Sequence, residues 1–262
     1  MCRLYGFRAT EVTKVECTLA HAQNALIVQS DKHRHGWGMA IYRNQKPYIE
    51  RQAKAAMEDE GFRRAAVRAY SDTVLAHLRR ATIGRVALEN THPFCHGPWV
   101  FAHNGTLPGF DNLRPKMLAT MTFEHRAAIQ GETDSEHIFH MILSMYEAMP
   151  ARSLLETLRA SLGQIVAWSE EIDPAARIGL NVLLTDGTRL VGSRWGRTLH
   201  YVERSGVHDC EICGFPHIRH DPRHSYRAVV IASEPISHEP WREVPDHSVF
   251  TVSLEMTLQI DP

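Results

Sequence analysis

The chain has 262 residues, of which 44% are hydrophobic and 23% charged, an ordinary composition for a globular protein. Its 29 basic and 30 acidic side chains give a net charge of -1, which argues against nucleic acid or an anionic membrane as the main partner. The N-terminal residues form no apolar leader, and the five cysteines fit reduced thiols better than a disulfide framework, so we expect a cytoplasmic protein.

Strand-like and helix-like segments follow one another in blocks, without a long linker or an internal repeat. Apolar residues bounded by turn residues predict early strands at residues 4–8, 37–42, 73–78 and 99–103. Residues 52–69 are expected to be helical. Apolar residues spaced three and four apart predict two longer helices at residues 134–149 and 153–168.

Strands return in the second half of the chain. They are predicted at residues 181–185, 189–193, 226–232 and 249–254. Asp186-Gly187 is a favoured hairpin turn between the first two of these strands, and residues 234–245 are expected to form an ordered surface loop. Strands, then helices, then strands indicate an α+β protein in which helices pack on sheets. We expect residues 1–262 to form a single domain.

The second residue is a cysteine. Removal of Met1 would leave Cys2 with a free α-amine beside its own thiol, and such an amine has a pKa of roughly 7.7 to 8. One residue would then supply a nucleophile and the base that takes its proton. The alternative is an N-terminal cysteine without a role, which position alone does not exclude.

The segment from Ala76 to Phe94, AHLRRATIGRVALENTHPF, leaves a predicted buried strand and enters a loop. Arg79 and Thr82 are therefore expected where a strand feeds a loop, a position that commonly lines a site. The alternative is a solvent-exposed arginine pair, which is the commoner situation for adjacent arginines such as Arg79 and Arg80.

The segment AHNG, from Ala102 to Gly105, also follows a predicted strand. Asn-Gly is the strongest short signal for a hairpin turn, so one interpretation is a turn without chemistry. The functional interpretation is an oxyanion hole, in which the Asn104 side-chain amide and the next backbone N–H donate to one developing negative charge.

Two further motifs are informative mainly through their surroundings. In GETDSE, Thr133 and Glu136 predict a capping box at the start of a helix, with Asp134 in its first turn. In HGWGMA, glycines on both sides of Trp37 allow a close approach of the backbone to another group.

These motifs occur in an informative order. MC at the start, GWG at Trp37, the His-x-Arg-x-Ala-Thr pattern, ENTHPF, HNG and ETDSE together resemble the glutaminase domain of class II glutamine amidotransferases, which are N-terminal-nucleophile hydrolases. The chain is most similar to the stand-alone subgroup without a fused synthase domain, because it ends soon after this pattern. The resemblance implies a four-layer αββα sandwich of two antiparallel sheets.

The resemblance also implies a role for each matching residue. Cys2 is expected to be the nucleophile, and Asn104 and Gly105 the oxyanion hole. Arg79 is expected to bind the substrate α-carboxylate, a bidentate task that suits a guanidinium, and Asp134 the α-ammonium. Three other residues are expected to assist, Thr82 beside the carboxylate and His92 and Trp37 in supporting positions.

Three functions fit these residues. The first is hydrolysis of glutamine or another γ-glutamyl amide through a γ-glutamyl thioester, with release of ammonia or an amine. The second is a glutaminase subunit that delivers ammonia to a separate synthase partner. The third is a non-catalytic binding module on the same fold, against which the intact Cys2, Asn104 and Asp134 argue. Neither catalytic function requires a cofactor.

A cluster of metal-ligand residue types lies outside these motifs, in CEICGFPHIRH. Cys210, Cys213, His217 and His220 are of the types that zinc accepts, which predicts a zinc-binding loop at residues 208–224. Four protein ligands would leave no open position, so the zinc would be structural. The alternative is a polar loop in a histidine-rich chain, since the spacing is shorter than in usual zinc fingers.

Overall fold

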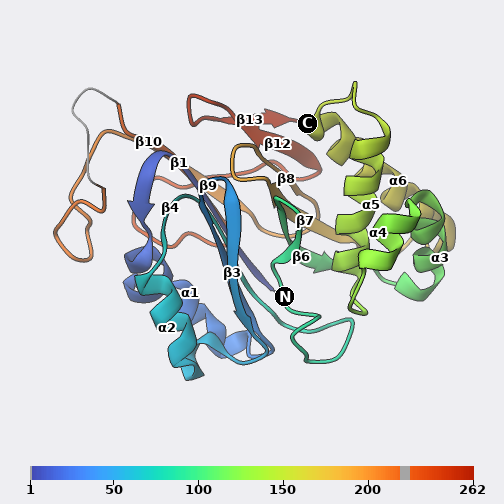
Figure 1. Cartoon of the computed structure of the whole chain (residues 1–262), viewed down its shortest axis with the longest axis horizontal. Helices are drawn as coiled ribbons and strands as arrows, with labels where there is room; N and C mark the ends of the chain where they lie inside the picture. Colours follow the sequence, from blue (N-terminus) through green and yellow to red (C-terminus); the bar gives the residue numbers. More distant parts are fainter. Residues whose placement is uncertain (1, 219–224) are drawn as a thin grey trace.

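The computed structural model describes residues 2–218 and 225–262. Two antiparallel β-sheets lie face to face in the middle of the molecule, and helices cover the outer face of each (Figure 1). No helix in these two ranges is long and apolar enough to cross a membrane.

Sheet A contains seven strands within the described residues, in the order β11-β9-β10-β1-β4-β2-β3. Its strands are β1 (Arg3–Lys14), β2 (Trp37–Arg43), β3 (Lys46–Gln52), β4 (Tyr70–Leu78), β9 (His200–Ser205), β10 (Arg227–Ala232) and β11 (Arg242–Glu243). The first strand of the chain is the central one, and it pairs with β10 on one side and β4 on the other. The N-terminal residues are therefore held between two segments from distant parts of the sequence.

Sheet B contains six strands in the same part of the chain, in the order β13-β12-β8-β7-β6-β5. Its strands are β5 (Phe94–His96), β6 (Trp99–Thr106), β7 (Gly179–Thr185), β8 (Leu190–Arg194), β12 (Ser248–Val252) and β13 (Leu258–Asp261). All the recorded strand pairs of both sheets are antiparallel.

The helices divide between the two outer layers. Short helical segments and α2 cover sheet A: η1 (Cys17–His21), α1 (Leu26–Gln29), η2 (Ser30–Lys32), η3 (Ala56–Glu58) and α2 (Glu60–Val67). Sheet B carries α3 (Phe110–Thr120), α4 (Phe123–Ala128), α5 (Asp134–Ala148) and α6 (Leu154–Ile172). The expected four-layer αββα sandwich of two antiparallel sheets is thus confirmed.

Buried apolar side chains fill all three interfaces between the layers. Along β4, Val74 and Ala76 pack with the helices on sheet A, whereas Leu75 faces sheet B, because successive strand side chains point to opposite faces. Leu75 packs in one cluster with Val100 and Leu183 of sheet B. These three side chains and those of Val74 and Ala76 have no exposed surface. Alternate side chains of β4 are therefore buried in two different layers of the core.

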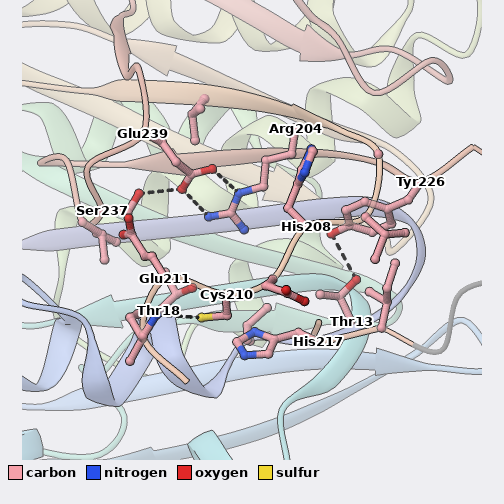
Figure 2. Close-up of a pocket in the computed structure, with 18 of the residues that line it drawn as sticks. Thr13, Thr18, Arg204, His208, Cys210, Glu211, His217, Tyr226, Ser237 and Glu239 are labelled. Carbon is pink, nitrogen blue, oxygen red and sulfur yellow. Dashed lines mark hydrogen bonds and ion pairs between the residues drawn. The ribbon is translucent and has the colours of Figure 1, made fainter. Parts of the chain in front are cut away.

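The connection from β9 to β10 folds over the outer face of sheet A. It helps to enclose a cavity of about 410 Å³, in which Arg204 of β9 forms an ion pair with Glu239 at 2.7 Å (Figure 2). Glu239 belongs to the predicted surface loop of residues 234–245, which is ordered against the sheet and contributes β11. The residues lining this cavity do not include Cys2.

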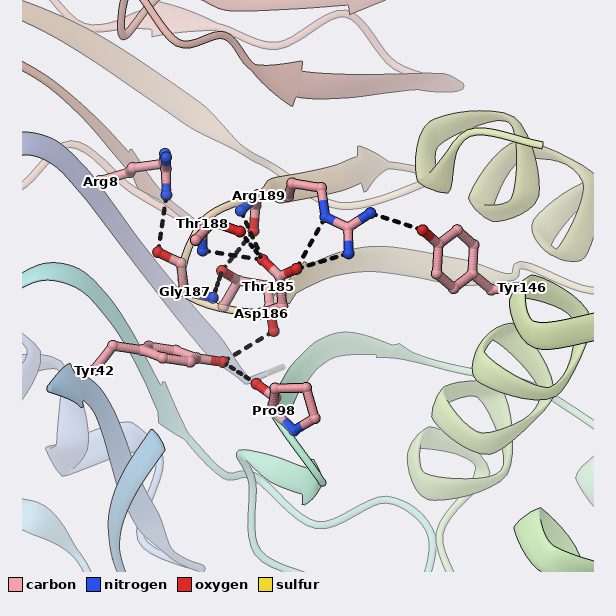
Figure 3. Close-up of polar contacts among 9 residues, drawn as sticks. All are labelled: Arg8, Tyr42, Pro98, Tyr146, Thr185, Asp186, Gly187, Thr188 and Arg189. Atoms are coloured by element: carbon pink, nitrogen blue, oxygen red, sulfur yellow. Dashed lines mark hydrogen bonds and ion pairs between the residues drawn. The ribbon is translucent and has the colours of Figure 1, made fainter. Parts of the chain in front are cut away.

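The predicted turn at Asp186-Gly187 is confirmed, and it links the two sheets (Figure 3). Gly187 has φ of +90°, a conformation that favours glycine, and its carbonyl oxygen accepts a hydrogen bond from Arg8 of β1 at 3.0 Å. The Tyr42 hydroxyl of β2 donates to the carbonyl oxygen of Thr185 at 3.0 Å. These contacts fix one end of sheet B against sheet A.

Two local expectations differ from the structure. Residues 52–69 are helical only in part, since β3 ends at Gln52 and the α-helix begins at Glu60. The sequence does not predict β3, because this edge strand alternates between exposed and half-exposed residues and has no apolar face. The predicted strand at residues 99–103 continues to Thr106, which changes the interpretation of Asn104.

Candidate active site

Cys2 lies directly before β1, at the start of the central strand of sheet A. Its side chain is 9% exposed, and its Sγ accepts a hydrogen bond from the backbone N–H of Arg80 at 3.3 Å. Burial raises the pKa of the Cys2 thiol, and the hydrogen bond from Arg80 opposes this rise only in part. The thiol is therefore protonated at neutral pH and needs a base before it can act as a nucleophile.

The start of β1 is anchored by Ser233, which follows the end of β10. The backbone N–H of Leu4 donates to Ser233 Oγ at 2.9 Å, and the Ser233 N–H donates to the Leu4 carbonyl oxygen at 3.1 Å. Asn104 Nδ2 donates to the same Ser233 Oγ at 3.3 Å. The serine hydroxyl thus holds the Asn104 amide close to the start of β1, which directly follows Cys2.

Asn104 and Gly105 do not form a hairpin turn, so that interpretation is wrong. Both lie within β6, opposite Asn181 and Leu180 of β7. A Cβ atom on Gly105 would lie 1.8 Å from the carbonyl oxygen of Gly179, so this position accepts no side chain. Asn104 is 2% exposed, and its Oδ1 has no hydrogen-bond partner among the described residues. Oδ1 can only accept, whereas the Nδ2 group carries two hydrogens and donates one of them to Ser233, which leaves one donor for a ligand among the recorded hydrogen bonds.

Arg79 lies just beyond the end of β4 and is 2% exposed, which excludes the solvated-arginine interpretation for it. Its guanidinium donates to backbone carbonyl oxygens of the following loop, at 3.1 Å from those of Ile83 and Gly84 and 2.9 Å from that of Arg85. Burial lowers the pKa of Arg79, while the charges of Cys2 and Asp134 raise it. The loop therefore folds around a buried charged group whose pKa is influenced by Cys2 and Asp134.

Thr82 connects this loop to the end of β6. Its hydroxyl lies 2.9 Å from that of Thr106, which in turn donates to the carbonyl oxygen of Gly105 at 2.7 Å. Thr82 is exposed, in contrast to Arg79. The two hydroxyls therefore join the loop of Arg79 to the strand of Asn104 at the surface.

Asp134 begins α5 and is 3% exposed. One carboxylate oxygen accepts from the backbone N–H of Leu107 at 2.8 Å, and the other accepts from the N–H of Ser135 at 2.8 Å. Its charge raises the pKa of the Cys2 thiol, whereas Arg79 lowers it, after the larger effect of burial. A cationic and an anionic group thus both act electrostatically on the thiol, with opposite signs.

The capping box predicted at this helix is only half formed. Thr133 Oγ1 accepts from the Glu136 N–H at 3.2 Å, as expected. The Glu136 carboxylate does not return to Thr133, however, and accepts instead from the N–H groups of Gln130 and Gly131 at 3.0 and 2.6 Å. Glu136 therefore stabilises the turn before α5, and the Asp134 carboxylate takes no part in those hydrogen bonds.

Three buried histidines lie together beside these residues. The rings of His77 and His92 stack with centroids 4.1 Å apart, and His77 Nε2 lies 3.0 Å from the carbonyl oxygen of His103. Burial lowers the pKa of His77 to about 3 and that of His92 well below its ordinary value, so both rings are neutral. His92 thus packs against β4 through a neutral ring, which fits a supporting position.

Trp37 lies apart from this group. Its Nε1 donates to the Asp59 carboxylate at 2.9 Å, and its ring packs edge-on against Phe62 of α2 with centroids 5.3 Å apart. The neighbouring Gly38 explains the glycine motif, because a Cβ atom there would lie 2.1 Å from the carbonyl oxygen of His92. Trp37 is therefore part of the core on the helix side of sheet A.

The predicted metal ligands are partly brought together. Cys210, Cys213 and His217 lie close to each other, and Cys17 of η1 joins them, with all four ligand atoms within 4.8 Å of one another. This cluster could hold a metal ion. His220, the fourth ligand expected from the sequence, lies outside the described residues. Cys17 is missed by the sequence because it is far from the other three along the chain and belongs to no local motif.

Comparison with known families gives one match that covers most of the chain. The model described as "Glutamine amidotransferases class-II" matches residues 1–254. This range contains all the residues placed around Cys2 above.

Individual proteins are similar over nearly the whole chain. A Saccharomyces cerevisiae protein named "Probable glutamine amidotransferase DUG3" is 26% identical, over 98% of this chain and 83% of its own length. The Mycobacterium tuberculosis "Gamma-glutamyl-hercynylcysteine sulfoxide hydrolase" is 27% identical, over 97% and 93%. A solved glutamine aminotransferase class-II domain protein from Silicibacter pomeroyi shares the fold, with a TM-score of 0.65, 22% identity and coverage of 99% and 98%.

Proposed function

The chain belongs to the class II glutamine amidotransferases, and on this basis we propose that it hydrolyses glutamine or another γ-glutamyl amide with Cys2 as the nucleophile. The observation that carries the proposal is the hydroxyl of Ser233, which accepts from both Leu4 and Asn104. It supports a site in which the nucleophile and an oxyanion donor are held in a fixed relation.

Removal of Met1 gives Cys2 an α-amine with a pKa of roughly 7.7 to 8. This amine takes the proton of the buried thiol, and the thiolate sulfur bonds to the amide carbon of the substrate. Negative charge then develops on the amide oxygen, which accepts from the Asn104 side chain and the Gly105 backbone N–H. The carbon–nitrogen bond breaks, and the proton held by the α-amine passes to the leaving nitrogen.

The product of this first half is a γ-glutamyl thioester on Cys2. Water attacks the thioester carbon while the α-amine accepts a proton from it, and the carbon–sulfur bond then breaks. The proton returns to the sulfur, and glutamate or its derivative leaves. All the groups that act belong to the chain, so the proposed reaction needs no cofactor. It does need a free thiol, for which a reducing compartment such as the cytoplasm is suitable.

Recognition of the substrate is assigned to its amino-acid head group. Arg79 offers a planar guanidinium to the α-carboxylate, with Thr82 beside it, and Asp134 offers a carboxylate to the α-ammonium. Since Arg79 also holds the carbonyls of its loop, substrate binding and loop order are expected to depend on each other.

The leaving group is a separate question, because it does not contact these head-group residues. One relative is named for a γ-glutamyl conjugate much larger than glutamine. We therefore propose that the chain fixes the γ-glutamyl group and accepts either ammonia or a larger amine as the leaving group. Delivery of ammonia to a separate synthase remains the second candidate for this same site.

The proposal is tested by release of glutamate from glutamine, glutathione and other γ-glutamyl amides by Met-trimmed protein. Cys2→Ala should abolish release, while the matched control Cys95→Ala, which changes an exposed cysteine in β5, should retain it. Turnover of glutamine that rises only after a synthase is added would identify the ammonia-delivering subunit. Failure to hydrolyse any of these amides, alone or with a synthase, would favour a binding module.

A further inference from the structure

The described Cys/His cluster joins two segments that are far apart in the sequence. Cys17 lies in η1, just after β1, whereas Cys210, Cys213 and His217 lie in the connection between β9 and β10. We propose that these four residues form a structural zinc site, with Cys17 rather than His220 as the fourth ligand. The zinc would fasten the β9–β10 connection to the N-terminal helical segment.

The backbone brings the two segments together independently of any ion. The N–H of Lys14, the last residue of β1, donates to the carbonyl oxygen of His217 at 2.9 Å, and Thr13 forms an isolated β-bridge with Ile218. This pairing places His217 beside the chain just before Cys17 enters η1. The Cys17 side chain is 7% exposed and so lies on the inner side of the cluster.

The two loop cysteines are held in a tight turn. The N–H of Gly214 donates to the Cys210 carbonyl oxygen at 2.8 Å, and Gly214 has φ of +74°. The N–H of Ile212 donates to Cys210 Sγ at 3.4 Å. A backbone N–H that donates to a ligand sulfur helps to orient that sulfur toward an ion.

The distances come close to those of a tetrahedral ion, which would draw the widest pair of ligand atoms together and move the nearest pair slightly apart. Zinc–sulfur and zinc–nitrogen bonds of about 2.3 and 2.0 Å place tetrahedral ligands roughly 3.5 to 3.8 Å apart. Cys213 Sγ and His217 Nε2 are already 3.1 Å apart, and the largest separation in the cluster is within 4.8 Å. Three sulfurs and one imidazole are a ligand set typical of closed structural zinc sites.

The stretch between Cys210 and His217 has little apolar packing of its own. Phe215 is 71% exposed and Ile212 is 38% exposed, whereas the flanking Val207 and Ile218 pack against the core of sheet A. Cys210 and His217 nevertheless line the cavity beside Arg204, where they form part of its wall (Figure 2). A zinc ion would therefore stabilise this wall in place of apolar packing.

The site is distant from the proposed chemistry. Cys2 precedes β1 and Cys17 follows it, and a strand of 12 residues spans roughly 35 to 40 Å at about 3.3 Å per residue. Loss of zinc should therefore change stability without removing the nucleophile. Failure of the zinc proposal and failure of the γ-glutamyl hydrolase proposal are accordingly separate results.

The first experiment measures metal in untagged protein and the ligands of that metal. We expect about one zinc per chain, and X-ray absorption at the zinc edge should show three sulfur neighbours and one nitrogen neighbour. Two sulfurs and two nitrogens would overturn the assignment of Cys17 in favour of His220. Protein without zinc after growth in zinc-supplemented medium, or with a disulfide between these cysteines, would overturn the site as a whole.

Variants supply the second test. Cys17→Ser and the surface variant Cys213→Ser should each lose most of the zinc and lower the melting temperature, whereas Cys95→Ser and His220→Ala should keep both. Cys213→Ser should still release glutamate from a γ-glutamyl substrate at the wild-type rate. Retention of zinc by Cys213→Ser would contradict the proposal even if Cys17→Ser, which alters a buried residue, did not fold.

Discussion

Asn104 of β6 in sheet B and Ser233, which directly follows β10 of sheet A, meet at one hydrogen bond of 3.3 Å, from the asparagine amide to the serine hydroxyl. The same hydroxyl oxygen accepts from Leu4, two residues after Cys2. Ser233 itself is 1% exposed and is not assigned to contact the substrate. In the proposed reaction Ser233 is a positioning residue, because one hydroxyl holds both the Asn104 amide and the start of the strand after Cys2.

Replacement of this hydroxyl should lower kcat more than it changes KM. Ser233→Ala removes the acceptor for the Asn104 amide, and loss of one such hydrogen bond costs about 1 kcal/mol, which corresponds to roughly a fivefold lower rate if it acts in the transition state. Steady-state kinetics on a γ-glutamyl substrate would measure both constants. Ser169→Ala is the matched control, since Ser169 is equally buried but lies in α6 and bonds to its own helix. A KM effect alone would contradict the positioning role.

Asn104→Asp tests the oxyanion donor with a side chain of the same size. The aspartate has no N–H and brings a negative charge toward the oxyanion, so kcat should fall by about a hundredfold or more. KM should change little, because the oxyanion exists only after the sulfur has attacked. Circular dichroism would confirm that the variant keeps the overall fold. Wild-type kcat in a folded Asn104→Asp protein would return this residue to a purely structural role.

An N-terminal extension should inactivate the protein where a C-terminal one does not. Any residue retained before Cys2 converts its α-amine into an amide, which cannot accept the thiol proton. Burial keeps the thiol protonated, so no thiolate would be available without that base. Two tagged forms, and the N-terminal form after its tag is removed by a protease that leaves Cys2 first, would measure the effect. Equal activity of the two tagged forms would exclude the α-amine as the base.

Arg79→Lys should weaken substrate binding and loosen the adjoining loop. A lysine cannot replace the guanidinium that donates to Ile83, Gly84 and Arg85 while also binding a carboxylate at two points. Loss of one charged hydrogen bond, at about 1.5 to 3 kcal/mol, predicts a KM raised roughly ten- to a hundredfold. Proteolysis of the loop should increase in parallel. Arg80→Lys is the control, because it alters the neighbouring arginine without changing these contacts.

The overall layers follow from patterns that the sequence displays openly. In the strand of Val74 and Leu75, successive side chains are buried on opposite faces of the sheet. The helix around Ile138 buries its apolar side chains against a sheet. Both patterns are visible in the sequence and predict the layers. The exposed edge strand β3 is not predictable in this way, because little of it is buried. The extent of β6 is also hidden, since the Asn104-Gly105 pair is a turn signal that pairing with β7 overrides.

Some residues of the candidate sites can be predicted from the sequence and others cannot. Residues that belong to short motifs, such as Cys2 and Arg79, can be predicted from the sequence, because the motifs and their order can be read directly along the chain. Ser233 and Cys17 are not, since each acquires its neighbours only when β1 is placed beside β10 or when the β9–β10 connection folds back. Long-range pairing, rather than local propensity, decides these contacts.

The buried histidines predict that acid destabilises the fold before most carboxylates are protonated. The pKa of His77 is lowered to about 3 by burial, against about 6.5 in an unfolded chain. Between these values the unfolded state binds more protons, so the stabilisation is fully present above pH 6.5 and is lost as the pH falls. Well below pH 6.5, one such histidine changes the free energy of unfolding by about 1.4 kcal/mol per pH unit, which amounts to about 2 kcal/mol between pH 7 and pH 5. Denaturant titrations at pH 7 and pH 5 would measure this slope.

His77→Gln separates this contribution from those of other groups. Glutamine retains an N–H that can donate to the His103 carbonyl oxygen but binds no proton in this range, so the variant should lose about 2 kcal/mol less stability than wild type between pH 7 and pH 5. His238→Gln, which changes an exposed histidine, should keep the wild-type slope. A change in the overall stability of His77→Gln does not affect this test, because the comparison is between the pH dependence of its free energy of unfolding and that of wild type. If wild type and His77→Gln lost stability equally between pH 7 and pH 5, His77 would have to be charged or solvated in the folded protein, and the buried neutral stack with His92 would be wrong.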